Sequence, residues 1–144
     1  MRIVTLKHGK DCKRFRVPTE KDWGELVEYV AEQIKPGDIL ALSGELGAGK
    51  TTFVQSLARE LGVKKNTPSP TFALMRSYAV RHPSIKRLIH VDAYRIENER
   101  DFVALDLDEE IADGISAVVI EWPENIKKWL GRQASVLDLS ITGF

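Results

Sequence analysis

The sequence is poor in cysteine and has no surplus of charge of either sign. Its 144 residues include one cysteine, Cys12, so no disulfide can form within the chain. The 21 basic residues are balanced by 21 acidic ones, whereas proteins that hold nucleic acid unaided usually carry a basic surplus. No stretch approaches the roughly 18 apolar residues of a membrane-spanning helix, and the apolar part of Met1–Lys7 is too short for a signal peptide. We therefore expect a cytoplasmic protein with no membrane association.

A glycine-rich octapeptide, Gly44–Thr51, is the most informative feature of the chain. It reads Gly-Glu-Leu-Gly-Ala-Gly-Lys-Thr and matches the phosphate-binding pattern G-x-x-x-x-G-K-[ST] at every specified position. An apolar run, Ile39–Leu42, precedes it, and Thr52–Leu61, with apolar residues at helical spacing, follows it and ends before a glycine. In such a loop, backbone N–H groups and the helix N-terminus surround a phosphate chain. The motif therefore predicts a nucleoside triphosphate site in which the lysine reaches the β- and γ-phosphates and the threonine hydroxyl binds Mg²⁺.

Strand-like and helix-like segments alternate along the chain, which predicts an α/β fold. Residues 1–17 favour a β-hairpin with strands at Arg2–Leu6 and Lys13–Val17. Thr19 is expected to be the N-cap of an amphipathic helix on which Trp23 faces the core. Further segments have the patterns of strands (Ile39–Leu42, Ala73–Val80, Leu88–Asp92, Ile115–Ile120 and Ser135–Thr142) or of short helices (Asn98–Leu105 and Asn125–Leu130). We predict a single P-loop NTPase domain over residues 1–144, with a mostly parallel central sheet flanked by helices and the hairpin as an addition.

Two of the predicted buried strands end in a carboxylate, Asp92 in one and Glu121 in the other. In open α/β sheets, ligands bind beyond the carboxyl ends of the strands. Either acid is therefore a candidate to complete Mg²⁺ coordination, directly or through water, or to orient an attacking water. The alternative role for each acid is a helix cap or a surface salt bridge.

Four further residues are candidates on local grounds. Thr71 follows two prolines and precedes an aromatic residue, so it presents a hydroxyl on a stiff segment, as switch segments do around a γ-phosphate. A turn threonine is the alternative. His90 lies inside a strand, a position more typical of a core residue than of a catalyst. Arg95 is placed to balance the acids or to contact a phosphate, and Tyr94 to pack beside them.

Four segments, taken in order, resemble the TsaE (YjeE) family of bacterial ATPases, which are required for threonylcarbamoyladenosine modification of tRNA. The segments are Leu42–Phe53, Ser69–Phe72, His90–Arg95 and Ile120–Glu124. Their order and spacing and the size of the chain agree with that family, and the resemblance covers about Thr19 to Leu139. One departure is Ala93, where family members often have leucine. The change leaves the preceding acid in place.

The resemblance implies a role for each matching position. Thr51 and Glu121 would contact Mg²⁺, and Asp92 and Thr71 would serve hydrolysis together with Glu121. Thr19 would lie near the base. Trp122 would matter for activity without being a metal ligand. The phosphates of ATP would be held by Glu45, Leu46, Gly47, Ala48, Gly49, Lys50, Thr51 and Thr52.

The resemblance also implies partners for this chain. The family powers a synthase assembly made with the TsaD and TsaB proteins. Those partners transfer the threonylcarbamoyl group to the adenosine next to the anticodon, so this chain would meet tRNA through the complex.

Three other functions are compatible with a phosphate loop. A small-molecule kinase is the main alternative, although such kinases usually need a lid and an acceptor pocket, and little chain remains after the core elements. A GTPase would need a guanine-reading Asn-Lys-x-Asp segment, which the sequence does not contain. A binding module that uses ATP as a switch with negligible turnover remains open.

Overall fold

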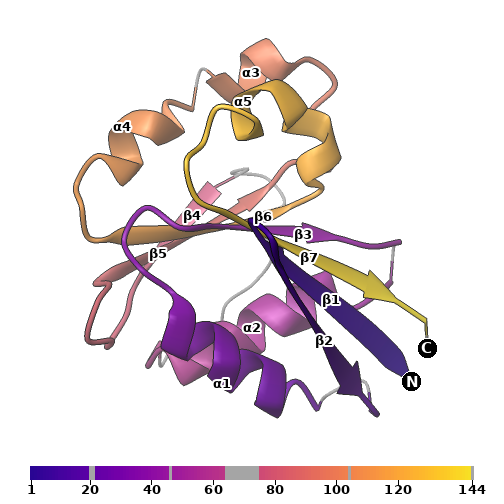
Figure 1. Cartoon of the computed structure of the whole chain (residues 1–144). Coiled ribbons are helices and arrows are strands. Elements are labelled where there is room, and N and C mark those ends of the chain that lie inside the picture. The colour runs from indigo at the N-terminus through magenta and orange to yellow at the C-terminus, as the bar shows by residue number, and fades with distance from the viewer. Residues whose placement is uncertain (20–21, 46, 64–74, 104, 144) are drawn as a thin grey trace.

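A computed structural model of the chain describes residues 1–19, 22–45, 47–63, 75–103 and 105–143 (Figure 1). Leu46 and Thr71, two of the predicted site residues, lie outside these ranges. The strands are β1 (Arg2–His8), β2 (Asp11–Val17), β3 (Ile39–Ser43), β4 (Met75–Ala79), β5 (Arg87–Asp92), β6 (Ser116–Glu121) and β7 (Val136–Thr142). The helices are α1 (Gly24–Gln33), α2 (Lys50–Glu60), α3 (Glu99–Val103), α4 (Leu107–Ile111), the 3₁₀ turn η1 (Pro123–Ile126) and α5 (Lys127–Leu130).

The strands form one mixed sheet in the order β2-β1-β7-β3-β6-β5-β4. The four central strands, β7, β3, β6 and β5, run parallel to one another. The N-terminal hairpin extends this sheet because β1 pairs antiparallel with both β2 and β7. At the other edge, β4 pairs antiparallel with β5. The predicted α/β fold and N-terminal hairpin are confirmed, and the hairpin is an integral part of the sheet.

Helices cover both faces of the sheet, with α1 and α2 on one face and α3, α4 and α5 on the other (Figure 1). β3, β5 and β6 are therefore buried on both sides, whereas buried and more exposed residues alternate along β7. In β3, Leu40 and Leu42 belong to the apolar cluster with α1 and α2, whereas Ile39 belongs to the cluster on the opposite face. Two-sided burial explains why β3, β5 and β6 are mostly apolar runs in the sequence, whereas apolar and polar residues alternate in β7. None of the helices in the described ranges has the length and apolar character needed to cross a membrane.

The first helix begins later than the sequence predicts, so the assignment of Thr19 as its N-cap is wrong. α1 begins at Gly24 with Trp23 in the capping position. Thr19 instead accepts a hydrogen bond from the backbone N–H of Asp22 at 3.4 Å, in a turn before the helix. The physical reason is the burial of Trp23, whose ring packs against Phe53 of α2 with 5.6 Å between the centroids. This contact sets where the chain enters the core, and it confirms Trp23 as a core residue.

Phe53 should be among the larger single contributors to stability, because its ring is fully buried and meets the Trp23 ring edge-on. Phe53→Ala should lower the free energy of unfolding by about 3–5 kcal/mol, the usual range for deleting a buried aromatic ring, as measured by urea denaturation. Val103→Ala, at an exposed position, should change that free energy by less than about 0.5 kcal/mol. Equal effects of the two substitutions would contradict this packing.

Candidate nucleotide-binding site

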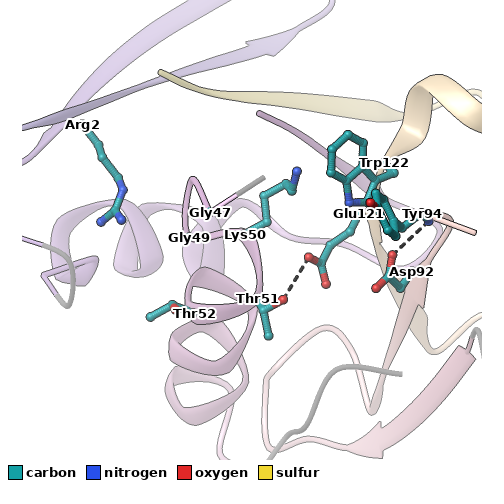
Figure 2. Close-up of a pocket in the computed structure, with 10 residues that line it drawn as sticks. All are labelled: Arg2, Gly47, Gly49, Lys50, Thr51, Thr52, Asp92, Tyr94, Glu121 and Trp122. Carbon is teal, nitrogen blue, oxygen red and sulfur yellow. Dashed lines mark hydrogen bonds between the residues drawn. The ribbon is translucent and has the colours of Figure 1, made fainter. Parts of the chain in front are cut away.

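A cleft of about 410 Å³ lies at the carboxyl ends of β3, β5 and β6, and Figure 2 shows the side chains that line it. This is the edge at which open α/β sheets bind their ligands. The lining residues are Arg2 from the hairpin, Gly47, Gly49, Lys50, Thr51 and Thr52 from the loop and α2, and Asp92, Tyr94, Glu121 and Trp122 from the segments at the ends of β5 and β6. The loop and both strand-end acids therefore share one cavity.

The loop between β3 and α2 has a backbone geometry that favours glycine. Gly47 and Gly49 have φ angles of +83° and +97°, a region that residues with side chains rarely adopt. A Cβ on Gly49 would also lie 2.9 Å from Cζ2 of Trp23. α2 begins directly after this glycine, at Lys50, and its first residues line the cleft. The loop therefore offers backbone N–H groups and the positive end of a helix to an anion at close approach.

Lys50 is held beside the loop by two contacts. Its Nζ donates a hydrogen bond to the carbonyl of Gly44 at 2.5 Å and lies 3.6 Å from the centre of the Trp122 ring, within the range of a cation–π interaction. Burial lowers the pKa of Lys50, and nearby carboxylates, first among them Glu121, oppose that shift. A phosphate beside Nζ would add further negative charge and raise this pKa again.

Glu121 connects the loop helix to the sheet. It is 3% exposed, and both of its carboxylate oxygens accept hydrogen bonds. Oε1 accepts from the Thr51 hydroxyl at 3.0 Å (Figure 2), and Oε2 accepts from Nε2 of His90 at 2.7 Å. His90 is fully buried, as its position in a strand predicts, but it also orients the carboxylate at the centre of the site.

The oxygen atoms at this point fit Mg²⁺. The Thr51 hydroxyl and the Glu121 carboxylate are hard ligands that already lie next to one another, and Mg²⁺ prefers such oxygens. Within the described parts of the chain, no group of three or more His, Cys, Asp or Glu side chains forms a metal cage. A pair of protein oxygens such as those of Thr51 and Glu121 suits an ion that keeps several waters and takes other ligands from phosphates.

Asp92 lies beside Glu121 because the two residues end adjacent parallel strands in register. Its Oδ1 accepts a hydrogen bond from the backbone N–H of Tyr94 at 3.0 Å, which holds the half-buried side chain at the cleft. In Figure 2 both carboxylates lie on the same side of α2. The two acids are thus placed to act on the same end of a bound ligand.

Two aromatic rings form the wall of the cleft beside Lys50. The ring centroids of Tyr94 and Trp122 lie 4.9 Å apart, and Trp122 has a φ of +60°, a strained conformation for a bulky residue. The side chain of Asn125 donates to the carbonyl of Ala93 at 2.8 Å and so ties together the segments that follow β5 and β6. Trp122 therefore contributes a ring face to the cleft rather than a metal ligand.

Four other predicted site residues are not among the described residues that line this cleft. Arg95 and Thr19 are exposed. Glu45 and Ala48 line a smaller cavity of about 170 Å³ near the end of β7. Within the described residues, the structure therefore brings together the second half of the loop, Asp92, Glu121 and the two aromatic residues.

One lining residue, Arg2, was missed by the sequence analysis. It is 6% exposed and belongs to β1, far from the loop in the sequence. No motif surrounds it, because its place in the site results from the pairing of the hairpin with β7. Only the tertiary structure identifies it.

Comparisons with known proteins found several relatives of this chain. A family model described as "Threonylcarbamoyl adenosine biosynthesis protein TsaE" matches residues 17–143. Three proteins named tRNA threonylcarbamoyladenosine biosynthesis protein TsaE illustrate the similarity. The protein of Aquifex aeolicus is 41% identical over 117 residues, which cover 80% of each chain. That of Mycobacterium tuberculosis is 36% identical over 123 residues, or 81% of this chain and 72% of the relative. That of Bacillus subtilis is 33% identical over 120 residues, or 83% of this chain and 72% of the relative.

His90 should stabilise the fold through its contact with Glu121. His90→Leu removes the donor to Oε2 and leaves a buried carboxylate oxygen without that partner, so the free energy of unfolding should fall by about 1–3 kcal/mol. His90→Gln offers an amide N–H and should recover part of this loss. Equilibrium denaturation of both variants provides the measurement. If the His90→Leu protein is as stable as the wild type, the 2.7 Å hydrogen bond does not hold the carboxylate in place.

Proposed function

We propose that this chain, which belongs to the TsaE family, binds ATP with Mg²⁺ and hydrolyses it for threonylcarbamoyladenosine biosynthesis on tRNA. The observation that carries the proposal is the hydrogen bond of 3.0 Å between Thr51 and Glu121. It joins the last residue of the phosphate loop to a buried acid at a strand end, and in P-loop NTPases an equivalent pair of a loop hydroxyl and a strand-end acid holds Mg²⁺ beside the phosphates. The pathway is the one for which the relatives are named.

The loop is the proposed phosphate-binding element. Backbone N–H groups along residues 45–52 surround the phosphates, and Lys50 turns from the Gly44 carbonyl toward the β- and γ-phosphates. Thr51 and Glu121 are the proposed protein ligands of Mg²⁺, which neutralises phosphate charge when it is bound. The short contacts of Lys50 and Thr51 within the cleft support this assignment.

Asp92 is the proposed residue that orients the attacking water. It lines the cleft in register with Glu121, and its carboxylate is an acceptor for a water proton. On the family resemblance alone, we propose that Thr71 serves hydrolysis near the γ-phosphate and that Thr19 lies near the base. Trp122 is proposed to act through its ring, which covers the Lys50 ammonium.

We propose that full activity needs the TsaD and TsaB proteins. Among the described residues that line the cleft, Lys50 is the cation on the side of the two acids. A partner that adds an arginine in trans accelerates phosphoryl transfer by about 10³–10⁵ in other P-loop enzymes. The chain has no surplus of basic residues with which to bind tRNA by itself. We therefore propose that it contacts tRNA within the complex with TsaD and TsaB, and that this complex is cytoplasmic.

A small-molecule kinase of the P-loop class is the alternative that the loop alone would allow. The fate of the γ-phosphate separates the two activities, because an ATPase transfers it to water and a kinase transfers it to an acceptor. Family membership favours the ATPase.

Glu121 and Asp92 should affect different steps. Glu121→Gln should raise the Mg²⁺ concentration needed for ATP binding by about tenfold or more, because a charge-assisted contact is lost. Asp92→Asn should leave that concentration almost unchanged and mainly reduce turnover. Calorimetric ATP titrations at several Mg²⁺ concentrations, combined with single-turnover hydrolysis, measure both effects. A reversed pattern would exchange the two roles, and two silent substitutions would reject both.

The isolated chain should hydrolyse ATP well below the roughly 10 s⁻¹ that is typical of dedicated enzymes, and added TsaD and TsaB should accelerate it. Lys50→Ala is the control, since it should bind ATP at least about tenfold more weakly and show no acceleration. Phosphate release with and without the partners is the measurement. Full-speed turnover by the lone chain, or threonylcarbamoyl transfer over many cycles without it, would contradict the proposal.

A further inference from the structure

We propose that Arg2 of the N-terminal hairpin binds the α-phosphate of the nucleotide. This inference rests on the proposed ATP site. It adds to that site a positively charged side chain that no sequence motif identifies. Three observations support it: the burial of Arg2 against the phosphate loop, the packing that holds it there, and the side of the loop on which it lies.

The guanidinium of Arg2 lies beside Gly49 of the phosphate loop. The residue lines the cleft although it is only 6% exposed. Its Cζ and Nη2 each lie 3.4 Å from the position that a Cβ on Gly49 would occupy. These distances place the charged group beside the loop, where the N–H groups that bind phosphate are found. A planar guanidinium binds phosphate oxygens through two parallel N–H donors.

Trp23 holds Arg2 in this position. The Cζ of Arg2 lies 5.5 Å from the centroid of the Trp23 ring, a distance at which a guanidinium and an aromatic ring attract one another. Trp23 is itself buried against Phe53 of the loop helix. The guanidinium of Arg2 therefore packs on a ring that is held against α2, whereas the backbone of Arg2 belongs to β1. This restricts the side chain before any ligand binds, which lowers the entropy lost on binding.

The side of the loop on which Arg2 lies identifies the phosphate that it faces. In Figure 2, Lys50, Glu121 and Asp92 lie to one side of the loop, and Arg2 and Thr52 lie on the other side. In a phosphate loop the lysine, threonine and metal mark the β- and γ-phosphates. The opposite side is the α-phosphate side, so Arg2 should contact a group that ADP and ATP share.

The test compares ADP and ATP binding by Arg2→Met, Arg2→Lys and the wild type. Arg2→Met should weaken ADP and ATP binding by the same factor, on the order of ten- to a hundredfold for a charge-assisted hydrogen bond. Arg2→Lys should show a smaller loss, again equal for the two nucleotides. Arg14→Met is the matched control, since it removes an exposed arginine from the same hairpin and should leave both affinities unchanged.

Several outcomes would overturn this inference. The first is unchanged ADP and ATP affinity in both Arg2 variants, and the second is weaker binding of ATP but not of ADP. The third is slower turnover with unchanged affinities, and the fourth is an equal loss of affinity in Arg14→Met. If thermal melting without nucleotide shows that Arg2→Met does not fold, Arg2→Lys decides the question. An equal loss of ADP and ATP affinity in Arg2→Lys would support the inference, and unchanged affinities would contradict it. Failure of the underlying ATP site would be recognised separately, because the wild type would then bind neither nucleotide and Lys50→Ala would have no effect.

Discussion

The carboxylate of Glu121 accepts hydrogen bonds from Thr51 and His90, and three elements of the chain meet at this point. Thr51 belongs to α2, His90 to β5 and Glu121 to β6. A buried carboxylate is stable only when hydrogen bonds satisfy its oxygens, so the three residues constrain one another. The contact fixes the N-terminus of α2 against the sheet, and with it the loop that precedes the helix. The geometry of the cleft therefore depends on this one carboxylate.

Strand order explains how the rest of the site is assembled around that contact. β3 lies between β7 and β6, and β5 follows β6, so the loop after β3 and the acids at the ends of β6 and β5 share one edge of the sheet. On the other side of β3, β7 pairs with β1 and brings the hairpin to the same site. The cleft thus has an acidic side suited to a metal and the outer phosphates, and a side where a buried arginine lies on the loop. We infer that the two sides bind opposite ends of one nucleotide.

Much of this architecture could be predicted from the sequence because its signals are local. The phosphate loop, the strands that end at Asp92 and Glu121, and the N-terminal hairpin are each encoded in a short stretch of residues. The errors and omissions are non-local. Thr19 has the composition of a cap, but the burial of Trp23 determines where α1 begins. The hydrogen bond between His90 and Glu121 joins two neighbouring strands that are far apart in the sequence. Arg2 reaches the loop only because the hairpin pairs with the sheet. Neither contact can be predicted from the local sequence pattern.

A crystal structure with a non-hydrolysable ATP analogue and Mn²⁺ in place of Mg²⁺ is the most direct test of the central claim. Anomalous scattering locates the metal independently of the protein. The account predicts the phosphates in the loop that leads into α2, with the metal next to the Thr51 hydroxyl and bound to the Glu121 carboxylate either directly or through one water. A metal remote from both side chains, or phosphates bound outside the loop, would contradict it.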